Sequence, residues 1–296
     1  MTQIEQLSLD PFLAEYAAGA MVRATKPIQA LLAPVVQVPS MVGHFKKHDR
    51  DSRLTLPKTR RVWDGRAVQL SITQYDGRYV CEVNALDVPI DKSVGADDLK
   101  FLVQDALDLL AEVESQALEF ETIAAAVGAA GAGVALDLAD ANNPIALIDT
   151  QLHALMKQAR SDGVAVAFDP LAWGKFKSHP KVIALGGANL SWETAPALFA
   201  GNARYQACYS LFDMSAEGVN EQIEFQMPAN TILIFSRSEV ATRRDPSFMK
   251  TFRLNPKKTP LKVVERGDGR VLIVKSDWFT DIQVTNLLGV ERLNVL

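Results

Sequence analysis

The sequence has few of the residues from which enzyme and metal sites are usually built. It contains two cysteines, Cys81 and Cys208, and four histidines among 296 residues. Two cysteines so far apart form neither a disulfide framework nor a zinc-binding pattern, and they suit a reducing compartment. Serine-hydrolase, zinc-protease and Walker motifs are absent from the sequence. We therefore expect no catalytic residue, cofactor or metal ion, and predict that the protein is not an enzyme.

Long apolar runs and a secretory leader are also missing. No run reaches the length that crosses a bilayer, and the start, MTQIEQLSLD, lacks the basic and apolar regions of a signal peptide. A net charge of −4 is not that of a dedicated nucleic-acid binder. With 48% hydrophobic residues the chain can bury a large core. These features predict a soluble, cytoplasmic protein without a membrane partner.

The longest regular pattern runs from Asp97 to Val127 and predicts one long helix. Apolar residues recur there at three- and four-residue steps, and no Gly or Pro interrupts before Gly128. Asp97 and Asp98 stand where an N-cap and first turn favour short acceptors and negative charge. Such a helix would be roughly 45 Å long, which suits a strut in an extended molecule. The expected apolar face is Leu99, Leu102, Val103, Ala106, Leu110, Val113, Ala117, Phe120 and Ala124.

The remaining face of this helix is acidic. Between Asp97 and Glu121 there are eight carboxylates and one lysine. Like charges at helical spacing repel one another, by a few tenths of a kcal/mol per pair. A solvated face tolerates this repulsion, and a basic partner would relieve it.

Residues 43–90 are predicted to be β-structure, with hairpin turns at Asp64–Gly65 and Asp76–Gly77. Between Gly43 and Arg66 eight basic residues stand against three acidic ones, with almost no apolar run to anchor them. We expect this hairpin to project. It is either solvated or lies on an acidic partner, for which the long helix of the same or the next copy is the obvious candidate.

Residues 1–42 are predicted to form an arm. After a short helix at 11–24, Pro27, Pro34 and Pro39 punctuate an apolar segment too closely for a helix or a central strand. Such a segment must lie along other protein, either its own core or a neighbour.

The rest of the chain alternates helix and strand patterns. Residues 145–265 predict a mixed α/β domain, and residues 261–296 return to strands around a hairpin turn at Gly267–Gly269. The expected helices are 144–160, 169–178 and 191–198, and the expected strands are 164–168, 204–212, 231–236, 261–265, 270–275 and 278–285.

Several strings, in this order, resemble the major capsid proteins of tailed double-stranded DNA bacteriophages, which have the Hong-Kong-97-type fold. They are Leu32–Val36 with Val42–Phe45, Ala172–Val182 with its His-Pro pair, Asp245–Arg253, and Ile282–Leu296. The third is similar to a P-S-F-G-x-T-F-R segment, with Met249 in place of Gly. The resemblance implies an α+β fold divided into an N-terminal arm (1–42), an E-loop hairpin (43–90), a P-domain with a spine helix (91–140), an A-domain (141–260) and P-domain return strands with a C-terminal tail (261–296).

The resemblance also implies a function and partners. The chain would self-assemble, as pentamers and hexamers, into the icosahedral head that encloses the phage genome, being assembled in the host cytoplasm and found in the virion. Further partners would be a separate scaffold protein, a portal protein, a decoration protein and packaged DNA, the last held weakly and without sequence preference. Alternatives are an encapsulin-like bacterial shell and a soluble α/β enzyme with an unrecognised site.

The basic hairpin would then lie over the acidic helix of the next copy. The expected contact residues on the hairpin are Lys46, Lys47, Arg50, Arg53, Lys58, Arg60 and Arg61. Their expected partners on the helix are Asp105, Asp108, Glu112 and Glu119. Some relatives join an E-loop lysine to a neighbour's asparagine, but no motif here fixes such a pair, and that activity is not predicted.

Overall fold

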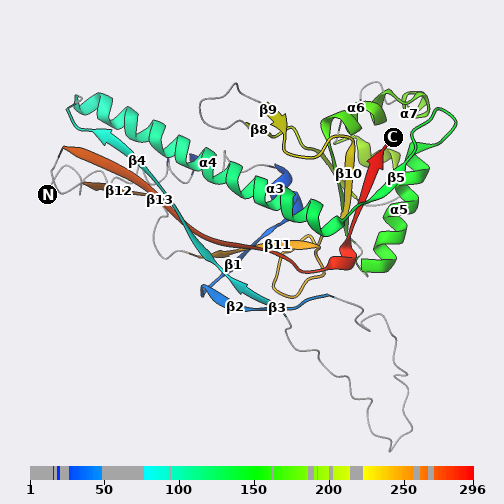
Figure 1. The fold of residues 1–296 in the computed structure, drawn as a ribbon, viewed down its shortest axis with the longest axis horizontal. Coiled ribbons are helices and arrows are strands. Elements are labelled where there is room, and N and C mark those ends of the chain that lie inside the picture. The colour runs from blue at the N-terminus through cyan, green and yellow to red at the C-terminus, as the bar shows by residue number, and fades with distance from the viewer. Residues whose placement is uncertain are drawn as a thin grey trace, which may run out of the picture.

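The molecule is elongated and has a sheet at each end of its long axis (Figure 1). The computed structural model describes residues 16, 19–20, 27–48, 77–93, 95–159, 161, 163–185, 190–191, 193–199, 203–213, 223–255, 261–265 and 270–296. The long helix α4 follows the first sheet and reaches the second, so it connects the two halves.

The first sheet, called the long sheet below, is built around one long strand. β13 (Val271–Val284) pairs along one edge with β4 (Glu82–Asp91), antiparallel, from Val271 opposite Asp91 to Thr280 opposite Glu82. Its other edge meets β12 (Leu261–Glu265) and β11 (Met249–Leu254) one after the other. β1 (Val35–Val38) adds a parallel strand outside β11. The sequence split β13 into two strands, and the structure shows one continuous strand.

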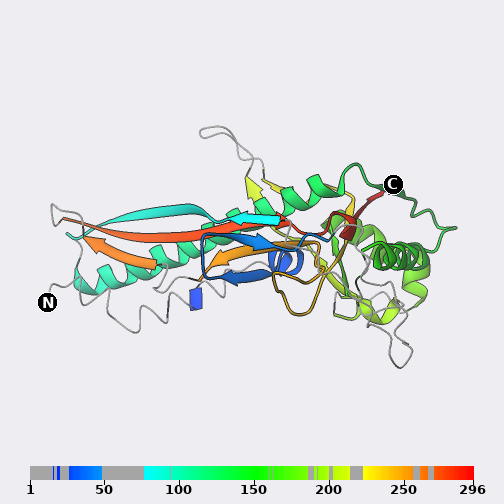
Figure 2. The same cartoon turned by 90° about the horizontal axis from the view of Figure 1, so that it is seen from below.

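Helix α4 (Ala96–Ala130) lies against one face of the long sheet (Figure 2). Leu99, Val103 and Leu110 are buried against the sheet with Ile90 and Leu272. The predicted helix is confirmed, but its N-cap is Gly95 and no side chain caps it, so the predicted Asp97 cap is wrong.

The helix also passes through Gly128, where the sequence placed its end. It stops before Gly131, whose φ of 67° lies in the left-handed region that glycine tolerates.

The second sheet has the strand order β5-β14-β10-β6-β7. Its strands are β5 (Val134–Leu136), β6 (Val164–Phe168), β7 (Arg204–Ala207), β10 (Thr231–Ser236) and β14 (Val290–Val295). Every residue of β6 and β10 is buried, which explains their continuous apolar sequence. Val164, Val166 and Phe168 face a core with α5 and α6, while Ala165 and Ala167 face the end of α4 and α3.

The helices of this half largely confirm the sequence pattern. α5 spans Pro144–Ala159, and α6 spans Pro170–Ser178 with the Asp169 carboxylate accepting from the Leu171 and Ala172 N–H groups. The predicted helix at 191–198 is a 3₁₀ turn, η2 (Ala195–Leu198), and the predicted strand at 204–212 is broken into β7 and β8. The remaining elements are α7 (Pro180–Ala184), β8 (Leu211–Asp213), β9 (Ile223–Phe225) and η3 (Leu287–Gly289).

The proline-rich segment after residue 26 packs on its own chain. Residues Pro27–Leu32 form helix α3, and Leu32 and Ala33 are buried against the second sheet. The prediction that this spacing excludes a helix is wrong, because Pro27 occupies a first-turn position and Pro34 follows the end. Of the earlier arm, Tyr16 and Ala20 also contact α4, and residues 1–15 lie outside the described residues.

The root of the basic hairpin is the antiparallel pair β2 (Val42–Phe45) and β3 (Gly77–Val80). The sequence pattern predicted a turn at Gly77, but this residue lies in β3 opposite Phe45. A Cβ at Gly77 would come within 2.4 Å of the Phe45 ring, and one at Gly43 within 2.3 Å of Tyr79. These two glycines therefore make room for the aromatic ring across the strand pair. The predicted turn at Asp64–Gly65 lies outside the described residues, as does that at Gly267–Gly269.

Sheet membership divides the chain differently from the domain boundaries expected from the sequence, as four strands show. β1 of the expected arm and β11 of the expected A-domain both belong to the long sheet. β5 and the last strand, β14, belong to the second sheet. β14 lies between β10, with which it pairs antiparallel, and β5, with which it pairs parallel, and both partners are distant in sequence.

Candidate functional site

The hairpin root is fixed to the long sheet by an aromatic stack. The Phe252 ring of β11 lies 5.1 Å from the Phe45 ring and 4.7 Å from the Tyr79 ring, measured between centroids. All three side chains are fully buried. Stacked rings in this range contribute beyond their buried area, so the stack fixes the root against the long sheet.

Basic side chains surround this root. Of the predicted contact residues, Lys47 is exposed, whereas Lys46 is 8% exposed and its backbone N–H donates to the Arg243 carbonyl at 3.1 Å. Arg50, Arg53, Lys58, Arg60 and Arg61 lie outside the described residues.

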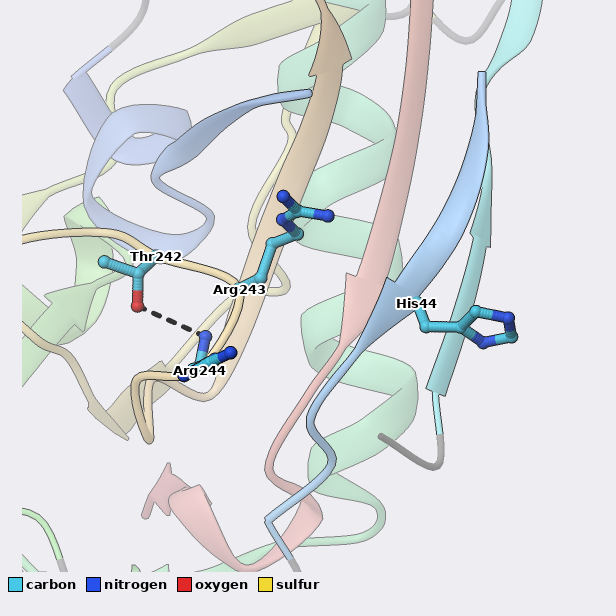
Figure 3. Close-up of a pocket in the computed structure, with 4 residues that line it drawn as sticks. All are labelled: His44, Thr242, Arg243 and Arg244. Carbon is cyan, nitrogen blue, oxygen red and sulfur yellow. Dashed lines mark hydrogen bonds between the residues drawn. The ribbon is translucent and has the colours of Figure 1, made fainter. Parts of the chain in front are cut away.

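The loop between β10 and β11 adds two arginines that the sequence analysis did not single out. Arg243 and Arg244 are exposed and, with His44 and Thr242, line an open pocket of about 490 Å³ (Figure 3). His44 comes from β2 and both arginines from the loop, so two segments distant in sequence supply one basic surface. The adjacent Arg-Arg pair before the Asp245–Arg253 string was the visible signal.

A buried ion pair holds this loop in place. The Lys250 Nζ lies 3.0 Å from the Asp245 Oδ2 and donates to the Asp245 carbonyl at 2.8 Å. Burial opposes the charge on Asp245, but Lys250, Ser247 and Thr242 together lower the pKa of its carboxyl below the ordinary value. The arginines therefore stand on a loop with a fixed backbone.

The acidic residues of α4 divide between the interior and the surface. Glu119 is fully buried and Glu114 is 2% exposed, so neither can meet another copy. Glu114 pairs with Arg253 of β11 at 2.7 Å and accepts from Ser276. Burial raises the pKa of Glu114, an effect that Arg253 only partly offsets. The predicted contact at Glu119 is thus wrong, because the buried face of α4 rotates along its length.

Three of the expected acidic contacts remain at the surface. Asp105 is exposed, and Asp108 and Glu112 are half-buried. Asp108 accepts the Tyr16 hydroxyl, and Glu112 accepts from Gln116 at 3.0 Å.

The exposed side of α4 also carries apolar residues, two of which, Leu102 and Val113, the sequence pattern assigned to the core. Leu102 is 38% exposed, Leu109 54% and Val113 38%. Their spacing of seven and four residues places them in one stripe on the helix. Phe120 continues the stripe and is met by Phe212 of β8 at 5.2 Å between ring centroids. The stripe from Leu102 to Val113, together with Asp105 and Glu112, is called the outer face below.

No cluster of three His, Cys, Asp or Glu side chains among the described residues could hold a metal ion. Both cysteines are buried, and burial raises the pKa of Cys208 to about 11, so this thiol stays protonated. None of the described helices is both long enough and apolar enough to span a membrane.

Comparison with known proteins identifies the fold. No family model and no curated protein matches the sequence. A phage-related protein of Bordetella bronchiseptica is similar in structure with a TM-score of 0.73 at 15% identity, over 96% of each chain. A protein assigned as the capsid protein of an Escherichia coli prophage gives 0.56 at 11% identity, over 96% of this chain and 98% of that one.

A third similar structure is a virus-like particle from Pyrococcus furiosus, with a TM-score of 0.50 at 12% identity over 99% of this chain and 100% of that one. The similarity extends over nearly the whole of the chain in each case, so it covers the overall arrangement of helices and strands described above. The resemblance in the sequence is thereby confirmed at the level of structure, and the chain has the Hong-Kong-97-type fold of phage capsid proteins.

Proposed function

We propose that this chain is the major capsid protein of a tailed bacteriophage, which assembles as pentamers and hexamers into the icosahedral head around the double-stranded DNA genome. The observation that carries the proposal is the outer face of α4, where apolar side chains stay exposed on a helix whose other side is packed. Together with the capsid fold, such a surface indicates a protein completed by further copies of itself.

The contact that we propose joins the basic hairpin root to the outer face of another copy. Lys47, Arg243 and Arg244 would lie near Asp105 and Glu112, and apolar groups of the hairpin would cover Leu109. Individual exposed ion pairs contribute roughly 0.2–1 kcal/mol, so their main effect is on orientation and rate of association. The apolar stripe would supply the larger share of the free energy.

The remaining partners follow from this function. A separate scaffold protein, a portal protein and a decoration protein would act during head assembly in the host cytoplasm, and the mature chain would be found in the virion. A net charge of −4 favours a weak and non-specific contact with the packaged DNA.

Charge reversal tests the proposed contact. We expect Lys47→Glu with Arg243→Glu and Arg244→Glu to leave the subunit folded and to abolish particle formation, measured by gel filtration and electron microscopy. The matched control reverses two exposed lysines of the second half, Lys157→Glu with Lys175→Glu, and should assemble. Particles of normal size and yield from the triple variant would refute the contact.

The same measurements separate the alternatives. Megadalton particles distinguish a shell protein from a soluble enzyme, and double-stranded DNA in heads isolated from infected cells distinguishes a phage capsid from a cargo shell of the encapsulin kind. After boiling in SDS we expect a monomer band near 32 kDa, since no cross-linking chemistry is proposed.

A further inference from the structure

Two arginines face one another at the end of the second sheet that lies nearest α3. Arg204 opens β7 and Arg237 directly follows β10, on either side of the first residues of β6. Phe235 and Ala165 share one side of the sheet, and Arg204 is in register with Ala165. By strand alternation both arginines therefore project from the same face, two strand spacings or roughly 10 Å apart.

The floor between the two arginines carries little side chain. It includes Gly163, which has no side chain, and a Cβ there would come within 2.0 Å of the Arg237 carbonyl. Two adjoining cavities of about 430 and 380 Å³ open here, and Arg204 and Arg237 line both of them, whereas Ala165 is fully buried and lines neither. The space above this floor can therefore take a group that both guanidinium ions reach.

Neither arginine forms an ion pair within the described residues, although the charge of Glu239 acts on Arg237 and opposes the lowering of its pKa. The Nε of Arg237 is buried without a hydrogen bond. Burial lowers the pKa of Arg237, and the charge of Arg204 lowers it further. An unpaired buried donor beside a like charge costs stability, and an anion between them would remove that cost.

We propose that the Arg204–Arg237 pair is an anion site that takes an aspartate or glutamate carboxylate from a second copy of this chain. The planar guanidinium group suits a carboxylate because it offers two parallel N–H donors. The inference rests on the proposed self-assembly, and it adds a contact on the second half of the molecule, away from the hairpin root.

The surroundings favour a single carboxylate over a nucleic-acid backbone. Glu193 and Glu239 stand at the rims of the two cavities. Each cavity taken alone is therefore lined by two arginines and one glutamate, a formal balance that suits one carboxylate, whereas a chain of phosphates requires an extended basic surface. A protein with net charge −4 also brings many carboxylates to every contact between its copies.

The first test removes the charges. The double variant Arg204→Gln with Arg237→Gln should lower the yield of particles roughly tenfold, since a desolvated charged contact is lost. Its thermal unfolding temperature as an isolated subunit should not fall, because the repulsion inside one copy is relieved. Lys157→Gln is the matched control and should assemble normally. A fall in subunit stability that parallels the yield would instead assign the arginines a structural role and overturn the proposal.

The second test identifies the partner group. In particles of Arg237→Lys treated with a carbodiimide, the introduced amine should form an amide with an Asp or Glu of another copy, seen as a dimer in SDS gels and mapped by mass spectrometry. The wild-type chain, which lacks this amine, should not give that cross-linked peptide. A link only to Glu193 or Glu239 of the same chain, or no link, would overturn the proposal.

The outcomes also separate this inference from the function on which it rests. A wild-type chain that never assembles refutes the proposed function, and the second copy with it. Wild-type yield in the double variant refutes the arginine contact alone, and unchanged particles with less bound nucleic acid would assign the site to phosphate instead.

Discussion

The two sheets differ in how completely a single chain covers them. In the second sheet every residue of β6 and β10 is buried, because helices pack on both faces. In the long sheet β4 alternates between exposed and partly covered residues, and Val83 is 58% exposed. Beyond it, the outer face of α4 leaves Leu109 54% exposed. The central strands of the second sheet are covered by their own chain, whereas the long sheet and α4 have surfaces that further copies would cover.

Under the proposed function, this contrast indicates which surfaces further copies would cover. A fully covered sheet gives a rigid body whose shape does not depend on neighbours. A sheet with an open face and a helix with an exposed apolar stripe gain free energy when another surface covers them, by about 25 cal/mol per Å² of apolar area. Variants should therefore change the subunit where the residue is buried within one chain, and the particle where it is exposed on a surface that another copy would cover.

The largest effect on the subunit is expected at the centre of the aromatic stack. Phe252→Ala removes the ring that contacts both Phe45 and Tyr79, and should cost about 3–5 kcal/mol in the free energy of unfolding. Urea unfolding measures the loss. Hydrogen exchange should show it first in β2 and β3, with β6 and β10 still protected, and equal loss of protection in both sheets would contradict the division into two halves.

The next largest loss of unfolding free energy is expected at the Asp245–Lys250 ion pair, which holds the loop that carries Arg243 and Arg244. Asp245→Asn leaves the fully buried Lys250 without its carboxylate and should cost about 3–4 kcal/mol at neutral pH. Because the pKa of Asp245 is lowered from its ordinary 3.8, its ionised form stabilises the fold above that pH, and this contribution is lost as the pH falls through the folded pKa.

The wild type and Asp245→Asn should therefore converge in stability as the pH falls below about 4. Denaturant unfolding at a series of pH values measures both chains. A difference in unfolding free energy that stays constant down to pH 2 would show that the carboxylate charge does not hold the loop.

How far the sequence predicts the structure also differs between the two halves. The buried strands Val164–Phe168 and Thr231–Ser236 and the helix Pro144–Ala159 match their predicted ranges to within a residue. Continuous apolar runs and the Asp169–Pro170 helix start are local sequence signals. They predict these elements correctly because the prediction does not depend on contacts with distant segments.

The features that the sequence missed depend on contacts between distant segments. Helix periodicity placed Leu102 and Val113 in the core and Glu119 on the surface, since it assumes one straight apolar face. The structure buries one side of α4 against the long sheet and a different side, further along the helix, against the second sheet. Leu102 and Val113 are therefore exposed, and Glu119 is buried. Likewise, Arg243 and His44 line the same pocket because the β10–β11 loop lies beside β2, which the sequence pattern does not predict.

A smaller loss of unfolding free energy is expected at the Glu114–Arg253 ion pair, which links α4 to β11. Arg253→Ala removes the partner of the buried Glu114 and should cost about 2–3 kcal/mol. Glu114→Gln should cost less, because the Arg253 side chain is 28% exposed and can turn to solvent, whereas Glu114 cannot. Thermal unfolding of both variants compares them, and the reverse order would mean that Arg253 is the group buried without compensation.

The smallest effect on the subunit, and the sharpest on the particle, is expected at Leu109 of α4, for which the adjacent Leu110 is the buried control. Leu110 is 2% exposed and faces the long sheet, whereas Leu109 is 54% exposed on the outer face. Leu110→Ala should cost about 2–5 kcal/mol in unfolding free energy, and Leu109→Ala less than about 0.5 kcal/mol. Yet Leu109→Ala should assemble poorly, because it removes apolar area that only a second copy would cover.

The two substitutions are chemically identical and neighbouring, so helix propensity and mass change equally in both. Urea unfolding of the isolated subunit and particle yield at equal protein concentration give the two readouts. If Leu109→Ala assembles as well as the wild type, the outer face of α4 is solvated surface, and the exposed apolar stripe no longer supports a contact between copies.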